Sequence, residues 1–354
     1  MNHKKPSTLR RGKHLVEAKL ITSEQQTTIE KVVQQFDIAI TPNVLETIQT
    51  HGDAVYRQYV PSADELTHTD TDSADPIGDL RHSKVKGIIH RYPDRCLLLP
   101  INSCAVYCRF CFRREKIGKG NPALTKKELT QALQYIADNK QIWEVILTGG
   151  DPLILKANAL HPIMDQLSKI DHVKVVRLHT RVPVVDPRRV DQKMVQTLKI
   201  ANKAVYVILH ANHPQEFTSA AEQACALLID AGIPMLSQST LLHGINDNAE
   251  VLAQLMRKFV SLRIKPYYLH HTDLAKGTGH FRTSIAKGQQ LLKQLRGRYS
   301  GLCQPHYVLD IPGGYGKVPI GPQYITTDCE HHDDNAYIVK DYQDGLHNYP
   351  PKNK

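Results

Sequence analysis

The sequence predicts an α/β fold in which a parallel sheet is covered by helices and curls into a partial barrel. Short apolar runs alternate with amphipathic helical segments through the middle of the chain, about thirty residues apart, as in repeated strand–helix–strand units. Such units build a parallel sheet, either doubly wound or closed into a barrel. Chemically reactive residues follow many of these runs, and this distribution favours the barrel.

A helical extension is expected to precede the repeat, over residues 1–75. Its first part, residues 1–22, is polar and basic, and we expect it to be flexible. Apolar residues at helical spacing after Ser23 predict one helix, and Thr41 before a proline is a typical start for a second. The polar segment 63–76 carries five acidic residues and ends in proline, which predicts a linker.

The repeat is expected to occupy residues 76–305, followed by a C-terminal segment over residues 306–354. Capping boxes at Thr125 and Ser219 predict the starts of two helices, and Gly232 is well placed to end the second. The expected strands are 97–101, 145–148, 173–178, 204–209, 233–237, 267–270 and 307–310.

The composition is typical of a globular protein, with 41% hydrophobic and 23% charged residues among 354. The sequence has no apolar run of about 18 residues and no apolar core of a secretory signal, so we expect a cytoplasmic protein without a membrane partner. The net charge of +10 allows attraction to polyanions. Because the basic residues are scattered, nucleic-acid binding is not expected as the primary role.

The most informative stretch is SCAVYCRFCFRRE, residues 103–115, which contains Cys104, Cys108 and Cys111. Seven cysteines in a chain without a secretory signal do not predict a disulfide framework. A closed zinc site normally has four protein ligands, whereas three thiolates in one loop suit an iron–sulfur cluster with one iron left open. The alternatives are a zinc site completed by a distant histidine and an unrelated group of buried thiols.

Two glycine-rich turns add to the cysteine loop. EVILTGGDPL places Gly149, Gly150 and Asp151 at the end of an expected strand, where paired glycines let the backbone approach a ligand closely. LDIPGGYGKVPI places Lys317 among glycines near the C-terminus. A lysine whose pKa is lowered by desolvation can form a Schiff base, most often with pyridoxal phosphate (PLP), whereas an exposed surface lysine is the ordinary alternative.

The loop CAVYCRFC resembles the cluster loop of radical S-adenosylmethionine (SAM) enzymes, including the aromatic Phe110 before the third cysteine. Together with RVPVVDPRRV, HANHPQE, SQSTLLHGIND, KPYYLHHTDLAKGTGHFRT and DIPGGYGKVPI, it makes the chain resemble the PLP-dependent lysine 2,3-aminomutase family over residues 75–326. The resemblance implies a partial (β/α)6 radical SAM barrel that binds a 4Fe–4S cluster, SAM and PLP. It also implies an isomerase that moves the 2-amino group of L-lysine to carbon 3, giving β-lysine.

The resemblance also assigns roles to individual residues. Lys317 would carry PLP, and Arg113 would pair with the substrate carboxylate, a task that suits a planar guanidinium. Asp273 and Asp310 would hold the distant ammonium of lysine, because without a cation two desolvated carboxylates repel each other and one is protonated. The cysteines Cys104, Cys108 and Cys111 would hold the cluster. The other expected cofactor ligands are Gly149, Gly150 and Asp151 for the ammonium of SAM, Arg91 and Arg95 for the PLP phosphate, and His210 and Gln238 for the SAM side of the pocket, where a core polar role is the equal alternative.

The chain departs from the free-standing family members at its C-terminus. Only Cys329 follows Lys317, and Asn248 stands where a loop cysteine is expected, so the intersubunit zinc of those enzymes is not expected. The short C-terminus resembles the branch that makes β-lysine for elongation factor P, whereas DIPGGYGK resembles the metabolic enzymes. The destination of β-lysine therefore stays open.

Two alternatives lie outside this class: a radical SAM enzyme that modifies RNA, and a catalytically silent iron–sulfur or zinc protein. The RNA-modifying enzyme would leave Lys317, Asp273 and Asp310 unexplained. The expected partners are L-lysine and a reducing protein such as flavodoxin or ferredoxin, and a homo-oligomer is left open.

Overall fold

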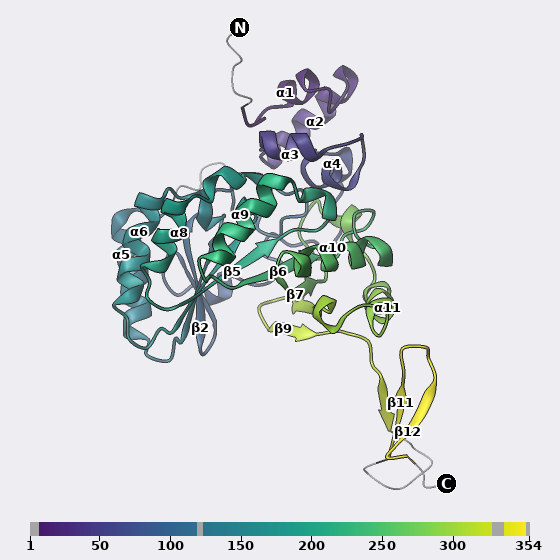
Figure 1. Cartoon of the computed structure of the whole chain (residues 1–354). Coiled ribbons are helices and arrows are strands. Elements are labelled where there is room, and N and C mark those ends of the chain that lie inside the picture. Colours follow the sequence, from purple (N-terminus) through teal and green to yellow (C-terminus); the bar gives the residue numbers. More distant parts are fainter. Residues whose placement is uncertain (1–6, 119–122, 328–335, 352–354) are drawn as a thin grey trace.

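The computed structural model describes residues 7–118, 123–327 and 336–351 (Figure 1). A nine-stranded sheet lies at its centre, with the strands side by side in sequence order. The strands are β1 (Ile88–Tyr92), β2 (Arg95–Ile101), β3 (Glu144–Gly149), β4 (Val175–Thr180), β5 (Ala204–His210), β6 (Met235–Thr240), β7 (Lys265–His270), β8 (His306–Ile311) and β9 (Gly316–Pro319). Strands β2 to β8 are parallel, and β1 and β9 pair antiparallel at the two edges.

One longer helix follows each of the first six parallel strands. These helices are α5 (Lys126–Asp138), α6 (Ala157–Ser168), α8 (Gln192–Lys199), α9 (Ser219–Asp230), α10 (Ala249–Ser261) and α11 (Ile285–Leu295). Shorter helices in the connections are α7 (Val182–Val185), η2 (Leu80–His82), η3 (Pro152–Ile154), η4 (Pro187–Arg189), η5 (Pro214–Glu216), η6 (Gly279–Phe281) and η7 (Gly301–Cys303). Six strand–helix units followed by a seventh strand confirm the expected partial (β/α)6 barrel.

The apolar pattern of the strands explains this arrangement. Leu147, Leu178 and Leu209 are fully buried, whereas their neighbours Thr148, His179 and His210 lie on the opposite face of the strands. Each expected strand overlaps an observed one. The sequence did not suggest β1 and β9, which are short and carry polar residues on the inner face. Thr125 caps α5 as expected, but the residue that caps α9 is Thr218 and not Ser219.

The N-terminal extension packs against the barrel as α1 (Gly12–Glu17), α2 (Ser23–Gln35), α3 (Pro42–Thr47), α4 (Ala54–Tyr59) and η1 (Ala63–Leu66) (Figure 1). The expectation that residues up to 22 are flexible is wrong for residues 7–22, because Leu15 is fully buried and Leu9 forms a β-bridge with Ile40. The linker expected over residues 63–76 is also wrong. Its Glu65 is fully buried and forms ion pairs with the arginines at 109 and 114 in the cysteine loop.

The two edges of the sheet approach each other, so the barrel is nearly closed. His82 Nε2 lies 2.8 Å from the carbonyl oxygen of Gly314, between η2 and the β8–β9 hairpin. A Cβ added to Gly78 would lie 2.4 Å from the backbone nitrogen of Gly314, so only glycine permits this contact. Closure brings the chain just before β1 next to the hairpin that carries Lys317.

A separate antiparallel sheet of β10 (Ile325–Thr327), β11 (Tyr337–Lys340) and β12 (Leu346–Tyr349) projects from the barrel at the C-terminal end (Figure 1). Cys329 lies outside the described residues. Asn248 caps α10, where its side-chain oxygen accepts a hydrogen bond from the backbone of Glu250 at 2.9 Å. Within the described ranges, no helix is both long and apolar enough to span a bilayer.

Candidate functional site

The cysteine loop follows β2 and is held by the Gly-Gly-Asp turn that follows β3. Gly150 donates a backbone hydrogen bond to Ile101 at 2.8 Å, and Asp151 donates one to Ser103 at 3.0 Å. A Cβ at Gly150 would lie 2.1 Å from the carbonyl oxygen of Ser103, and Gly149 has a φ of +104°. Both glycines are therefore needed for the turn to lie against the cysteine loop.

The three thiols of this loop influence one another electrostatically. Burial raises the pKa of Cys104 well above its ordinary value, and the negative charges of Asp151, Cys111 and Cys108 raise it further. Burial and Cys108 likewise raise the pKa of Cys111 to about 11. A bound metal would have to displace these protons, since thiolates are the ligands.

The thiols are not arranged around a single ion. Within the described residues, no three histidine, cysteine or acidic side chains are placed to hold one metal ion.

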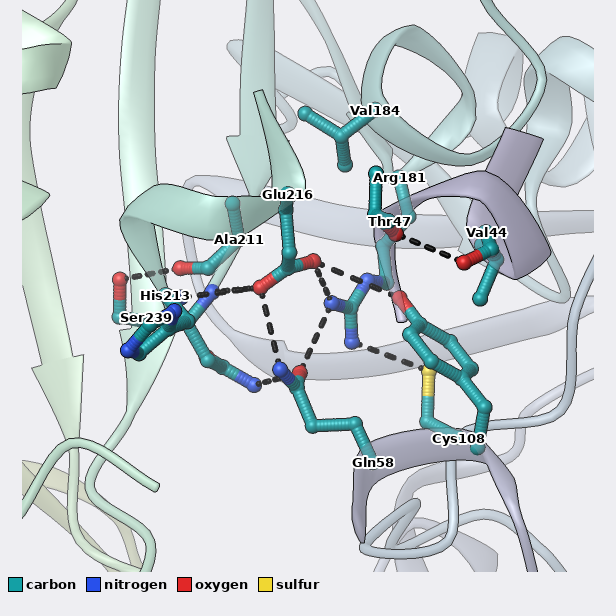
Figure 2. A network of polar contacts seen from close by, with 12 residues as sticks. Val44, Thr47, Gln58, Cys108, Arg181, Val184, Ala211, His213, Glu216 and Ser239 are labelled. Atoms are coloured by element: carbon teal, nitrogen blue, oxygen red, sulfur yellow. Dashed lines mark hydrogen bonds and ion pairs between the residues drawn. The ribbon is translucent and has the colours of Figure 1, made fainter. Parts of the chain in front are cut away.

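Arg181, directly after β4, contacts Cys108 in a buried polar network (Figure 2). Its Nη1 donates to Cys108 Sγ at 3.1 Å, and its Nη2 pairs with Glu216 of η5 and donates to Gln58 of α4 at 3.0 Å. Burial raises the pKa of Cys108, and the charge and hydrogen bond of Arg181 oppose this effect. Arg181 and Glu216 lie in the segments RVPVVDPRRV and HANHPQE that carry the resemblance, but the sequence analysis assigned no role to them or to Gln58.

The Asp151 carboxylate is occupied by the protein itself. Its Oδ1 accepts from Thr180 Oγ1 at 2.7 Å and from the Leu153 backbone at 3.0 Å, and its Oδ2 accepts from the Arg181 backbone at 2.7 Å. These bonds fix the turn between β3 and η3 and tie it to the end of β4.

Lys317 lies inside the barrel on β9, opposite Asp310 of β8 in the antiparallel register. Its Nζ forms an ion pair with Asp310 Oδ2 and lies 3.4 Å from Nδ1 of His270. Its backbone nitrogen donates to Tyr92 Oη at 2.8 Å, and its Nζ lies 5.6 Å from the centre of the Tyr268 ring. The lysine is therefore an enclosed, oriented side chain and not a mobile surface group.

The two aspartates differ strongly in acidity. Burial would raise the pKa of Asp310, but hydrogen bonds and charge from His270 and Lys317 outweigh it and lower the pKa below its ordinary value. Burial and the negative charge of Asp310 raise the pKa of Asp273 to about 7, against the opposing effect of Lys317 and Arg113. Lys317 thus stabilises the charged form of Asp310, while Asp273 tends to be protonated.

Arg113 connects the cysteine loop to the group formed by Lys317, Asp310 and His270, which we call the lysine cluster. Its Nε donates to Asp79 Oδ2 at 2.9 Å, and its Nη1 lies 3.5 Å from Thr148 Oγ1. The other oxygen of Asp79 accepts from Arg91 at 3.2 Å, and Arg91 lies 3.8 Å from Asp310. These contacts form a continuous path from a residue two places after Cys111 to Lys317.

Arg91 and Arg95 have different environments. Arg91 also donates through Nη2 to the carbonyl oxygen of Ile77 at 2.6 Å, so its Nη2 is fully engaged by Ile77 and Asp79. The Arg95 side chain is one-third exposed, pairs with Asp94 at 2.7 Å, and stacks 3.9 Å from the centre of the Tyr92 ring. Since the Tyr92 hydroxyl binds the Lys317 backbone, Arg95 is the more available cation beside the lysine.

Histidines line the inner face of the barrel. His210 packs edge-on against Phe110, with ring centroids 5.8 Å apart, and is in register with Gln238 of β6. Burial, followed by the charges of Arg181 and His270, lowers the pKa of His210 well below its ordinary value. The sequence interpretation missed His179 and His270, although both lie at the ends of expected strands, as His210 does.

The inner face fits bound cofactors, because several of its buried polar atoms have no partner within the described part of the chain. These atoms are the Nε of Arg91, the Nε of Arg181, and the Nε2 of His179 and His210. Unpaired buried polar groups are rare in folded proteins, and water, an ion or a bound cofactor can supply the partner. Three thiols, an enclosed lysine and unpaired donors in one barrel are the set that an iron–sulfur cluster, SAM and PLP require.

A cavity of about 190 Å³ opens beside this path and is bordered by Asp79, Arg113, Asn102 and Gly149, among others. It therefore places the Gly-Gly-Asp turn and Arg113 around one space. The three thiols and Lys317 do not border this cavity, and the cysteine loop is connected to Lys317 by the contacts from Arg113 through Asp79 and Arg91 to Asp310.

Two family models match the chain. The model described as the radical SAM superfamily matches residues 98–256, and the one described as lysine-2,3-aminomutase matches residues 292–353. The L-lysine 2,3-aminomutase of Acetoanaerobium sticklandii is 39% identical over 93% of this chain and 79% of its own length. The L-lysine 2,3-aminomutase of Clostridium subterminale is 40% identical over 86% of this chain and 74% of its own length. The glutamate 2,3-aminomutase of Clostridioides difficile is 37% identical over 87% of this chain and 73% of its own length.

Proposed function

This chain belongs to the lysine 2,3-aminomutase family of radical SAM enzymes, and from this premise we propose how its residues convert L-lysine to β-lysine. The protein is an isomerase that uses a 4Fe–4S cluster, SAM and PLP. When bound, these cofactors supply a carbon-centred radical that removes hydrogen from carbon 3 and a conjugated system across which nitrogen moves. The protein supplies position, charge and exclusion of water.

The ammonium at the far end of the substrate would be held by Asp310 and Asp273. Asp310 already binds one ammonium, that of Lys317. A carboxylate that pairs with one ammonium would also suit that of the substrate, and the elevated pKa of Asp273 marks a second carboxylate that gains by pairing with a cation. This carboxylate pair is the observation that carries the proposal.

The carboxylate of the substrate would be bound by Arg113, which Asp79 orients through its Nε. This leaves the guanidinium edge with Nη1 and Nη2 for a bidentate contact. Since the path of contacts from Arg113 through Asp79 and Arg91 to Asp310 is short, the two ends of one lysine would be fixed inside the same interior.

This arrangement favours lysine over glutamate, although relatives acting on either amino acid have similar identity to this chain. Glutamate would bring a third negative charge to the carboxylate pair, which the cations nearby could not balance. An RNA-modifying enzyme is not favoured, because the aminomutase family match extends over the segment that carries Lys317.

For the cofactors, we propose that Cys104, Cys108 and Cys111 hold the cluster and that Lys317 carries PLP. Arg95 is our first choice for the PLP phosphate because it is the more exposed cation, with Arg91 second because Ile77 and Asp79 engage its Nη2. The backbone of Gly149 and Gly150 would receive the SAM ammonium, with Asp151 fixing the turn, and His210 and Gln238 would line the SAM side. We keep the division into an extension (1–75), a barrel (76–305) and a C-terminal segment (306–354), noting that β8 and β9 continue the barrel sheet.

The function is tested by anaerobic incubation of the protein with L-lysine, SAM, PLP and dithionite, followed by amino-acid analysis. We expect β-lysine to form, and only traces of isomer from glutamate, ornithine or arginine in parallel reactions. Formation of β-glutamate at a comparable rate would refute the assigned substrate. In the cell, a reducing protein such as flavodoxin or ferredoxin would replace dithionite, and the net charge of +10 favours an acidic one.

Asp310→Asn should weaken lysine binding by a hundredfold or more. Removing one partner from a buried ion pair costs about 3 to 5 kcal/mol, and every 1.4 kcal/mol is about tenfold in affinity. The effect is measured as the KM for lysine. Asp344→Asn is the matched control, because Asp344 pairs with Lys293 at the surface and such pairs contribute little. An unchanged KM in Asp310→Asn would place the ammonium elsewhere.

Lysine affinity should decrease as the pH falls below about 7, where Asp273 is protonated. An ammonium favours the charged carboxylate, so binding lowers this pKa and, below pH 7, must release a proton. The affinity should therefore fall by up to about tenfold per pH unit, the limit for one linked proton. Lysine titrations between pH 5.5 and 8.5 measure the slope, and Asp273→Asn should flatten it. A slope that persists in Asp273→Asn would assign the proton to another group.

A further inference from the structure

Three segments that are distant in sequence meet at the guanidinium of Arg181 (Figure 2). Cys108 comes from the cluster loop, Glu216 from η5 after β5, and Gln58 and Tyr59 from α4 of the N-terminal extension. The extension lies outside the barrel, and nothing in the proposed chemistry requires it. Its contact with a residue that touches a cluster thiol therefore calls for an explanation.

The contacts leave the Arg181 guanidinium little freedom. Its Nη1 donates to Cys108 Sγ at 3.1 Å, while its Nη2 donates to Gln58 Oε1 at 3.0 Å and pairs with Glu216. The aromatic rings of Tyr59 and Phe110 lie 5.2 and 5.4 Å from its central carbon. The Nε is buried without a partner in the described residues, which leaves one donor for a bound group.

Gln58 is fully buried and fixes this arrangement from the side of the extension. Its Oε1 accepts from both Arg181 and Asn212 Nδ2 at 3.0 Å, and its Nε2 donates to Glu216 Oε1 at 3.3 Å. The backbone nitrogen of Asn212 also donates to Glu216, at 2.7 Å. Gln58 thus connects both partners of the buried ion pair, and an apolar residue at this position would release Arg181 on one side.

We propose that Arg181 is a positioning residue for the iron–sulfur cluster, held against Cys108 by Gln58 of the N-terminal extension, and that it raises the reduction potential of the cluster. The proposal rests on the proposed function only in requiring a cluster on the three cysteines. Reduction adds one electron, and therefore one negative charge, to the cluster. A cation that donates a hydrogen bond to a ligand sulfur stabilises the more negative state, and hydrogen bonds to sulfur are known to set such potentials. The extension would thereby tune how readily the reducing protein delivers its electron.

The test is a redox titration of the reconstituted full-length protein without SAM or lysine, followed by the electron paramagnetic resonance signal of the reduced cluster. Arg181→Met combined with Glu216→Gln removes both charges, so that no carboxylate is left buried alone. We expect the reduction equilibrium to become at least tenfold less favourable, a shift of about 59 mV to more negative potential for one electron. Iron content should stay at the wild-type level.

Two further variants separate the contributions of charge and position. Gln58→Met preserves volume and keeps the Arg181–Glu216 pair, and it should shift the potential in the same direction by a smaller amount. Arg181→Lys keeps the charge but cannot span Cys108, Gln58 and Glu216, and it should give an intermediate shift. The matched control is Arg177→Met with Glu144→Gln, which removes a neighbouring ion pair between β4 and β3 that does not contact a thiol. Its potential should equal that of the wild type.

An unchanged potential in the Arg181→Met/Glu216→Gln protein with full iron content would overturn the proposal. If that protein fails to take up the cluster, Gln58→Met and Arg181→Lys decide, and wild-type potentials in both would overturn it. A shift in the Arg181 variants without one in Gln58→Met would refute the role of the extension. An iron-free wild-type protein after reconstitution would instead refute the proposed function, so the two failures are distinguishable.

Discussion

Lys317→Ala should abolish both covalent attachment of PLP and formation of β-lysine, while the iron content stays unchanged. Lys317 is the residue whose Nζ reaches the barrel interior between Asp310, His270 and Tyr268. A Schiff base with a carbonyl compound requires the primary amine of a lysine side chain. Alanine removes the nucleophile and leaves the cysteine loop, on the other side of Arg113, untouched.

This experiment uses reduction with borohydride and peptide mass spectrometry, which locates the lysine that carries PLP. Lys317→Arg is an informative second variant, because it keeps a cation beside Asp310 but cannot form the covalent bond. Loss of turnover in both variants would separate the cofactor role of Lys317 from a structural role in the ion pair. Lys287→Ala on the exposed side of α11 is the control and should retain PLP and activity. Full turnover of Lys317→Ala would contradict the assignment.

The alternation of apolar runs and helices was sufficient to predict the parallel barrel, because each of the parallel strands begins with or runs through a short apolar stretch and a helix follows each of the first six. It could not predict β1 or β9. Those edge strands are short, and their inner residues Arg91 and Lys317 are charged, so neither shows an apolar run. Their pairing depends on the closure of the sheet, which local sequence does not encode.

The site was predicted where a motif carries the chemistry, as for the cysteine loop, the paired glycines and Lys317. It was missed where a residue acts through a tertiary contact. Asp79 lies in a turn without a motif, and its role follows only from the positions of Arg113 and Arg91. One signal was available: His179 and His270 lie at or next to the last residue of their strands, as His210 does, so inspecting the strand ends would have found them.

The acidic segment before the barrel illustrates a different limit. Clustered charges usually indicate solvent exposure, and this reasoning suggested a linker. In the structure, Glu65 is buried between two arginines of the cysteine loop, Asp72 pairs with Arg282, and Asp75 pairs with Lys116. The acidic residues and the basic cysteine loop neutralise each other, and the charge pattern of one segment alone could not reveal this.

Cys108→Ser should lose most of its iron and all measurable activity, and it is the second of the two largest effects that we expect. Burial raises the pKa of each thiol in the loop, so these groups are ionised only when a metal binds them. A serine hydroxyl, which is far harder to ionise, cannot replace the thiolate. Arg181 would also lose its acceptor at 3.1 Å, leaving a buried donor unpaired.

Cys225→Ser is the matched control for this loss, because Cys225 is fully buried on α9 and does not belong to the cysteine loop. It should cost some stability, as polar substitutions in a core do, but keep the wild-type iron content and activity per folded molecule. Iron is measured after anaerobic reconstitution and desalting, and β-lysine is measured on the same sample. If Cys108→Ser formed β-lysine without iron, the radical would have to arise elsewhere, and the three cysteines would be only structural. Loss of iron and activity together in Cys108→Ser, but not in Cys225→Ser, would tie the reaction to this loop.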